Sequence, residues 1–204
     1  MEQASNAQKT TVGLIVLAAG ESRRMKQPKQ LLIFKGKTLL RRAAETALAS
    51  NAEKICVVLG ANYEKLKTEI SDLQLEIAFN ENPRAGMSSS LKSGLKKLLE
   101  IEPNLSGVLV MLVDQPLVET ALLNRLIEIF RMGKRAVVAC EYGETFGVPA
   151  VFSSQLFDEI LNLSVEGGAK GLIEEFKDSA EIIPAPEAAF DVDTPEDYAR
   201  LTAS

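Results

Sequence analysis

The chain has 204 residues, of which 46% are hydrophobic, and its formal net charge at pH 7 is −5. A chain of this size can bury a sizeable core without staples, and its acidic balance argues against a nucleic-acid-binding surface. Histidine is absent, which excludes histidine-based acid–base triads and histidine-ligated zinc. We therefore expect any bound metal to be a hard cation, such as magnesium, held by oxygen ligands.

The cysteines and the first residues indicate where the protein resides. Cys56 and Cys140 each lie in an apolar run, so we interpret them as buried small hydrophobic residues rather than as a disulfide, a metal site or a nucleophile. Residues 1–11 lack the apolar region of a signal peptide, and no stretch reaches the length of a membrane span. We expect a flexible tail over 1–11, one domain over 12–204, and a cytoplasmic protein with no membrane partner.

Strand-like apolar runs alternate with helical patterns along the chain, which is typical of a mostly parallel sheet with helices on both faces. The predicted strands cover 14–18, 54–60, 75–79, 108–113, 135–140, 148–152 and 180–183. The predicted helices cover 39–49, 63–70, 88–99, 119–131, 155–163 and 170–176. A last helix is predicted to start at Pro195 with Thr194 as its N-cap. The pattern predicts a three-layer α/β/α, Rossmann-like fold.

The segment after the first predicted strand has the composition of a phosphate-facing loop. Ala18, Ala19 and Gly20 let the backbone approach a ligand closely, and Gly20 tolerates a positive φ, so successive N–H groups can converge on an anion. The sequence matches neither G-x-x-x-x-G-K-[ST] nor G-x-G-x-x-G, which disfavours a P-loop ATPase and a Rossmann dinucleotide domain. The alternative is an ordinary glycine turn with a solvated cluster of cations: Arg23, Arg24, Lys26 and Lys29.

Polar residues also follow two later strands. Asp114 comes directly after the run 108–113, and Asn80 follows the run 75–79. Ligands of open parallel sheets bind beyond the carboxyl ends of the strands, so these residues are expected at one rim with the first loop. An unpaired carboxylate at the end of a buried strand is costly. Asp114 therefore needs a metal ion or a cation beside it, unless it only caps the turn before Pro116.

Two further segments point to the same rim. In FDVDTPED, alternation places Asp191 and Asp193 on one face, although an acidic residue there can also serve only to start the last helix. In GMSSSL, a helix opens after Gly86, so its backbone N–H groups and serine hydroxyls are candidates for binding a base or ribose. A serine run at a helix start can equally act as an N-cap.

Together these segments resemble the signature of the MobA/MocA-like nucleotidyltransferases. The resemblance is closest to the molybdenum cofactor cytidylyltransferases, including relatives that serve xanthine dehydrogenase maturation. The motifs occur in order over nearly the whole chain: LAAGESRRMKQPKQLL (17–32), GMSSSL (86–91), VDQP (113–116), GVPAVF (147–152) and DVDTPEDY (191–198). The resemblance implies a fold of the nucleotide-diphospho-sugar transferase type.

The resemblance also implies a reaction, in which a phosphate of the acceptor attacks the α-phosphorus of a nucleoside triphosphate in line and pyrophosphate leaves. Arg24 would neutralise the pyrophosphate, and Lys29 would stabilise charge on the α-phosphate. Asp114 and Asp193, the latter preferred over Asp191, would hold Mg²⁺ across the phosphates. Such a transfer needs positioning and charge neutralisation rather than a covalent nucleophile. The nucleotide-binding residues would be Leu17, Ala18, Ala19, Gly20, Asn80, Gly86, Ser88, Ser89 and Ser90.

The substrates are inferred in the same way. Guanylyltransferase relatives carry LAGG where this chain has LAAG, and the methyl group of Ala19 is expected to crowd a purine, which favours CTP over GTP. The implied acceptor is molybdopterin bearing its metal, and the implied partner is a molybdenum hydroxylase of the xanthine dehydrogenase type. The chain departs from the family pattern at Lys26, where relatives have Gly, and at 165–170, where VEGGAK replaces G-D-x-G-A-R.

Two other functions remain open. A cytidylyltransferase for methylerythritol phosphate or a sugar phosphate would share the fold and the first loop, although the GVPAVF and DVDTPEDY motifs favour the molybdopterin branch. A non-catalytic cofactor-binding chaperone would also bind a nucleotide. It would not require two metal-binding carboxylates beside Arg24 and Lys29.

Overall fold

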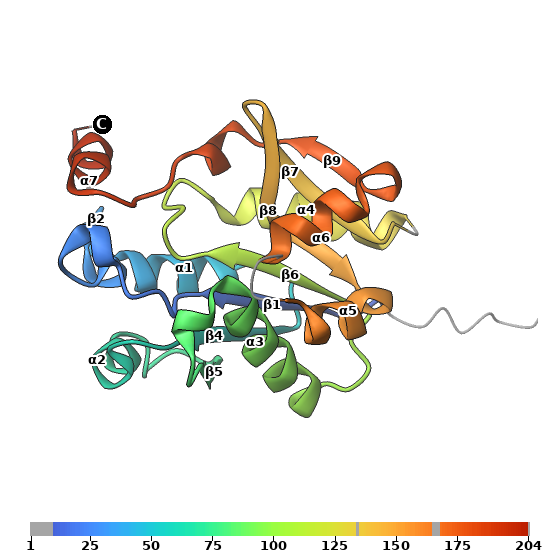
Figure 1. Cartoon of the computed structure of the whole chain (residues 1–204), viewed down its shortest axis with the longest axis horizontal. Coiled ribbons are helices and arrows are strands. Elements are labelled where there is room, and N and C mark those ends of the chain that lie inside the picture. Colours follow the sequence, from blue (N-terminus) through green and yellow to red (C-terminus); the bar gives the residue numbers. More distant parts are fainter. Residues whose placement is uncertain (1–9, 134, 165–167, 204) are drawn as a thin grey trace, which may run out of the picture.

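A seven-stranded sheet forms the centre of the computed structural model, which describes residues 10–133, 135–164 and 168–203 (Figure 1). The strand order is β5-β4-β1-β6-β8-β7-β9. All neighbours are parallel except β8, which runs antiparallel to β6 and β7. The strands are β1 (Val12–Leu17), β4 (Lys54–Leu59), β5 (Glu76–Phe79), β6 (Gly107–Leu112), β7 (Val137–Tyr142), β8 (Thr145–Ser153) and β9 (Glu181–Pro184).

Helices cover both faces of the sheet, which confirms the predicted three-layer α/β/α fold (Figure 1). Successive residues of β1 point to opposite faces, so Leu14 and Val16 pack into one apolar cluster while Ile15 and Leu17 pack into the other. The first cluster is covered by α1 (Leu39–Leu48), α2 (Tyr63–Glu69) and α4 (Thr120–Met132). The second is covered by α3 (Met87–Ile101), α5 (Phe157–Asn162) and α6 (Gly168–Glu175). Burial on both faces explains why β1 is a continuous apolar run.

The predicted elements agree with the observed ones to within three residues at each end. The hairpin of β2 (Ile33–Phe34) and β3 (Lys37–Thr38) was not predicted, because strands of two residues show no periodicity. Both cysteines are buried and free, as expected. Most of the predicted tail lies outside the described residues. Its last residue, Thr11, is hydrogen-bonded to the domain: its carbonyl oxygen accepts from the Ser106 N–H at 2.8 Å.

The last helix, α7 (Pro195–Thr202), carries the predicted cap. The Thr194 side chain accepts from the Asp197 N–H at 3.2 Å, and the Asp197 carboxylate accepts from the Thr194 N–H at 2.9 Å. Across the molecule, the Tyr198 hydroxyl donates to the Ile33 carbonyl oxygen at 2.8 Å, which places α7 beside β2 (Figure 1). These contacts fix the segment that enters α7 and therefore the position of Asp193.

Strand order determines where a ligand can bind. From β1 the chain builds outward through β4 to β5 and then returns to β6 on the other side of β1. The carboxyl ends of β1 and β6 therefore flank the switch point of the sheet, where open α/β sheets bind ligands. Among the described residues, no helix has the length and apolar character that crossing a membrane requires.

Candidate active site

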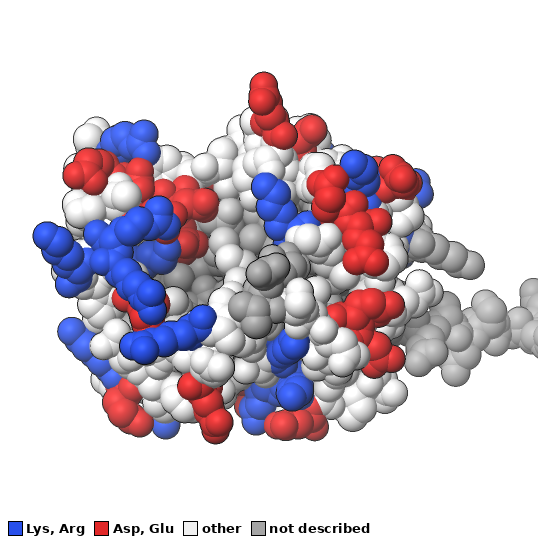
Figure 2. Space-filling view, viewed as in Figure 1, with Lys and Arg blue, Asp and Glu red and all other residues white. Residues whose placement is uncertain are grey.

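A cavity of about 420 Å³ opens at the carboxyl ends of β1 and β6. One wall is the loop after β1, which contributes residues 17–20, and a second is the start of α3, with Pro83, Gly86 and Ser90. The third wall combines the end of β6 with the segment before α7. Figure 2 shows Lys and Arg side chains gathered over the segment that follows β1, where Arg23, Arg24 and Lys26 are exposed.

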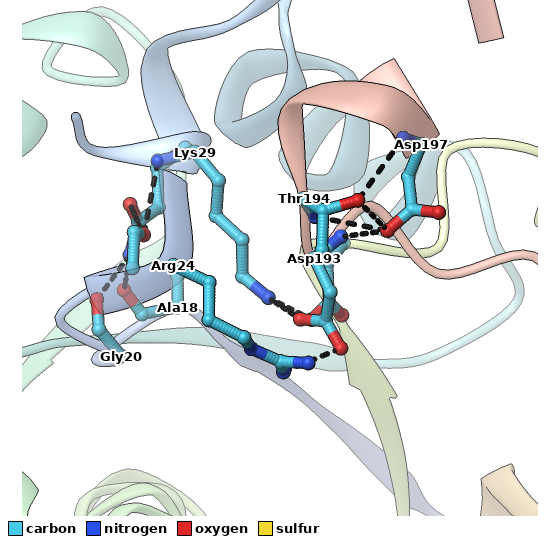
Figure 3. A network of polar contacts seen from close by, with 10 residues as sticks. Ala18, Gly20, Arg24, Lys29, Asp193, Thr194 and Asp197 are labelled. Carbon is cyan, nitrogen blue, oxygen red and sulfur yellow. Dashed lines mark hydrogen bonds and ion pairs between the residues drawn. The ribbon is translucent and has the colours of Figure 1, made fainter. Parts of the chain in front are cut away.

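Four charged side chains from segments far apart in the sequence meet in this cavity: Arg24, Lys29, Asp114 and Asp193. Figure 3 shows Arg24 and Lys29 directed toward Asp193. The Lys29 ammonium group donates to Asp114 Oδ2 and, at 2.8 Å, to Asp193 Oδ1. The Arg24 guanidinium lies 2.8 Å from the other oxygen of Asp193. The cations proposed from the sequence thus lie in one chain of ion pairs with the carboxylates proposed as metal ligands.

Burial and charge act in opposite directions on these groups. The Lys29 and Asp114 side chains are only 13% and 15% exposed. Burial alone would lower the pKa of Lys29, but the two carboxylates raise it above its ordinary value. Burial would raise the pKa of Asp193, whereas Lys29 and Arg24 lower it below its ordinary value. Lys29 and Asp193 are therefore charged at neutral pH.

Asp191, which the sequence analysis ranked below Asp193, lines the same cavity. Val192 between them is fully buried and donates its N–H to the Asp114 carbonyl oxygen at 2.9 Å, so both acidic residues face the cavity. Burial, together with the charges of Asp114 and Asp193, raises the pKa of Asp191 to about 6. Asp114 Oδ1 is buried and has no hydrogen-bond partner. The cavity therefore holds more negative charge than its two cations neutralise.

Gln30 organises the loop after β1, a role that the sequence analysis did not assign. Its side-chain amide donates to the carbonyl oxygens of Ala18 at 2.9 Å and Gly20 at 2.8 Å. Its amide oxygen accepts from the Ser22 hydroxyl at 3.2 Å. Gln30 lies thirteen positions past the end of β1, where no periodic pattern marks a buried side chain, so only the folded loop reveals its role. Lys26, which stands where relatives have Gly, takes a φ of 56°, in the left-handed region that favours glycine.

Ala19 lines the cavity but is only 2% exposed. A Cβ placed on Gly60 would stand 2.9 Å from the Ala19 Cβ and 2.8 Å from the Ala19 carbonyl oxygen, so Gly60 makes room for this residue. The methyl group of Ala19 therefore packs against Gly60. The methyl group would therefore affect a bound base indirectly, by setting how far the loop after β1 stands from Gly60.

The structure brings Leu17, Gly86 and Ser90 to the cavity but not Asn80, Ser88 or Ser89. Asn80 is 3% exposed, and its amide nitrogen donates to the hydroxyls of Ser89 and Ser90, at 2.8 Å each. Asn80 therefore holds the start of α3. The reason is strand order, because Asn80 follows β5, which β4 separates from β1.

The segment VEGGAK, at 165–170, can be placed only in part. Residues 165–167 of VEGGAK lie outside the described residues, while Gly168 to Lys170 open α6. Ala169 packs into the apolar cluster beneath α3. The GVPAVF motif lies on β8, next to β6.

A known family profile, described as the MobA-like NTP transferase domain, matches residues 14–181. The chain belongs to this family. Its members are nucleotidyltransferases, so the resemblance drawn from the sequence motifs is confirmed at this level. The cavity lies at the switch point of the sheet, which is where open α/β sheets bind ligands.

The similar proteins span nearly the whole chain. The purine catabolism protein PucB of Bacillus subtilis is 28% identical, over 90% of this chain and 92% of its own. The nicotine blue oxidoreductase of Paenarthrobacter nicotinovorans is 29% identical, over 92% and 94%. The crystal structure of Rv0371c from Mycobacterium tuberculosis superposes with a TM-score of 0.84 at 28% identity, covering 96% and 98%. A complex of the same protein with manganese gives a TM-score of 0.80 at 27% identity, covering 96% and 100%.

Proposed function

We propose that this member of the MobA-like family transfers CMP from CTP to the phosphate of molybdenum-bearing molybdopterin and releases pyrophosphate. The observation that carries the proposal is the convergence of Arg24, Lys29, Asp114 and Asp193 in one cavity, beside a glycine-containing loop. A site that only binds a nucleotide would not need two carboxylates facing the phosphates. Nucleotidyl transfer uses both charges, because it needs a divalent cation and groups that neutralise the leaving pyrophosphate.

The carboxylates fit a magnesium ion that is shared with the substrate. Within the described part of the chain, no group of three or more His, Cys, Asp or Glu residues could hold a metal by itself. Mg²⁺ is usually bound by one or two carboxylates plus substrate phosphates, and Asp114 and Asp193 match that pattern. The buried, unpartnered Asp114 Oδ1 is a free ligand atom. When bound, the ion supplies charge neutralisation at the phosphates.

The cavity residues have separate roles in the proposed transfer. When the nucleotide binds, Arg24 and Lys29 exchange their ion pairs with Asp193 for contacts to the phosphates. Arg24 then contacts the leaving pyrophosphate, and Lys29 contacts the α-phosphate. The acceptor phosphate attacks the α-phosphorus in line, a new phosphoanhydride bond forms, and the bond to the β-phosphate oxygen breaks. The cavity walls align the two substrates, which replaces covalent catalysis by positioning.

CTP and molybdopterin are the specific part of the proposal. Support for CTP comes from Ala19, in the LAAG variant of the first motif. Support for molybdopterin comes from the GVPAVF and DVDTPEDY motifs. A molybdenum hydroxylase of the xanthine dehydrogenase type is the proposed recipient of the product, and the protein is proposed to be cytoplasmic.

A pyrophosphate-release screen tests the proposal. Each of the four nucleoside triphosphates is incubated with Mg²⁺ and with molybdopterin, methylerythritol phosphate or a sugar phosphate as acceptor. We expect release with CTP and molybdopterin, and loss of release in Asp114→Asn with an unchanged circular dichroism spectrum. Pyrophosphate release with another acceptor, and none with molybdopterin, would show that molybdopterin is not the substrate. Tight CTP binding without turnover of any acceptor would favour the chaperone.

A further inference from the structure

Gln30 stands behind the loop that follows β1, as a buried amide whose hydrogen bonds all go to that loop. It is 1% exposed, and its two donor hydrogens are taken up by the Ala18 and Gly20 carbonyl oxygens. Its acceptor oxygen is taken up by Ser22 Oγ, which also accepts from the Lys29 N–H at 3.0 Å. Gln30 therefore links the two ends of the loop to each other and, through Ser22, to the backbone of Lys29.

These bonds determine the direction of two peptide units. A trans peptide is planar, so the N–H of the next residue points opposite to the carbonyl oxygen. Because Gln30 draws the carbonyl oxygens of Ala18 and Gly20 to itself, the N–H groups of Ala19 and Glu21 point away from it. In the described part of the chain neither N–H has an acceptor, whereas the Ala18 N–H donates to the Val58 carbonyl oxygen at 3.0 Å. Ala19 is 2% exposed, and buried backbone donors almost always have a partner in proteins.

We propose that Gln30 is a positioning residue that holds the N–H groups of Ala19 and Glu21 toward an anionic group of the nucleotide. This inference rests on the proposed function for the identity of the anion, a phosphate of the nucleoside triphosphate. Gln30 contacts the phosphate only through the backbone that it orients. Through Ser22, it also fixes the start of the turn that carries Lys29 into the cavity.

The test follows the amide signals of the loop in the full chain labelled with ¹⁵N. In the wild type, we expect the amides of Ala19 and Glu21 to shift on addition of CTP with Mg²⁺. Gln30→Met keeps the volume of the side chain but removes its bonds. Its affinity for CTP should fall roughly a hundredfold or more, as expected for the loss of two hydrogen bonds to a charged group. GTP affinity should fall by the same factor, because phosphate contacts do not distinguish bases.

Gln115→Met is the matched control. Gln115 is also a buried glutamine whose amide donates to two carbonyl oxygens, those of Ala188 at 2.9 Å and Val148 at 3.3 Å, on the other side of the cavity. A general loss of packing would affect both variants alike. Only Gln30→Met should abolish the shifts of the two loop amides.

CTP affinity in folded Gln30→Met within twofold of the wild type would overturn the proposal. If that variant does not fold, Ser22→Ala removes the hydroxyl that bonds both Gln30 and the Lys29 N–H. Its CTP affinity should fall severalfold, and the shifts of the Ala19 and Glu21 amides should weaken with it. Unchanged affinity in Ser22→Ala would likewise overturn it. If the wild type binds no nucleotide, the proposed function fails, and inorganic tripolyphosphate then tests Gln30 alone. Shifts of the two amides with that anion in the wild type, lost in Gln30→Met, would support the positioning role, and no such shifts would refute it.

Discussion

Replacing Lys29 by Gln tests whether one ammonium group keeps two cavity carboxylates paired. Lys29 donates to both Asp114 and Asp193, and the Lys29 and Asp114 side chains are largely buried. Removing one partner of a buried ion pair typically costs about 3–5 kcal/mol, because a charge is left uncompensated. Arg24 still covers Asp193 in the variant, so we expect the lower end, about 3 kcal/mol.

The loss should be visible in thermal unfolding at pH 7 with a chelator present. In a domain of this size, 1 kcal/mol corresponds to roughly 2–4 °C in the midpoint, so we expect a decrease of about 6–12 °C. Lys26→Gln provides the control. Lys26 is an exposed lysine of the same loop, and such surface changes usually stay within about 0.5 kcal/mol.

Mg²⁺ should affect the unfolding midpoints of the wild type and of Lys29→Gln differently. In the wild type, Lys29 already neutralises charge on both carboxylates, so Mg²⁺ alone should bind weakly and change the unfolding midpoint little. In Lys29→Gln, Asp114 has lost its ion pair and Asp193 keeps only the exposed Arg24, so a cation can bind there. A cation at ten times its dissociation constant stabilises by about 1.4 kcal/mol. The reasoning is wrong if Lys29→Gln is as stable as the wild type in chelator, or if Mg²⁺ stabilises both proteins equally.

Three further substitutions test single features of the site. Ala19→Gly should let the wall at Gly60 recede and relax the preference for CTP over GTP in pyrophosphate release; an unchanged ratio would contradict the steric argument. Lys26→Gly should raise the free energy of unfolding in urea by about 0.5–1 kcal/mol, because glycine adopts the observed φ of 56° without strain. Lys67→Gly, inside α2, should instead lower it by about 1 kcal/mol, and a decrease in both variants would refute the strain. The pKa of Asp191 is raised to about 6 by burial and by its acidic neighbours, so the folded state keeps a proton that the unfolded chain loses near pH 4. Wild-type stability should therefore fall as pH rises from about 4 through 6, and Asp191→Asn should flatten this fall in urea titrations with chelator; an unchanged slope would exclude Asp191 as its source.

Local sequence patterns predict the layers of this fold. A strand buried on both faces must be apolar at every position, which is why β1 and β6 are recognisable without a structure. Amphipathic spacing in turn marks the helices that cover them. Residues that interrupt these patterns at strand ends, such as Asp114, are visible for the same reason, since a charge there needs a partner.

By itself, the sequence determined the type and order of the elements, the family, and the charged residues with which a phosphate site could be built. Only the tertiary structure decided that Lys29 pairs with Asp114 and Asp193, residues 85 and 164 positions away, and that Gln30 holds the loop carbonyls. It also decided that Asn80 braces α3 rather than lining the cavity. Periodicity reports which face of an element is buried, whereas contacts between distant side chains depend on strand order in the sheet, which no local pattern encodes.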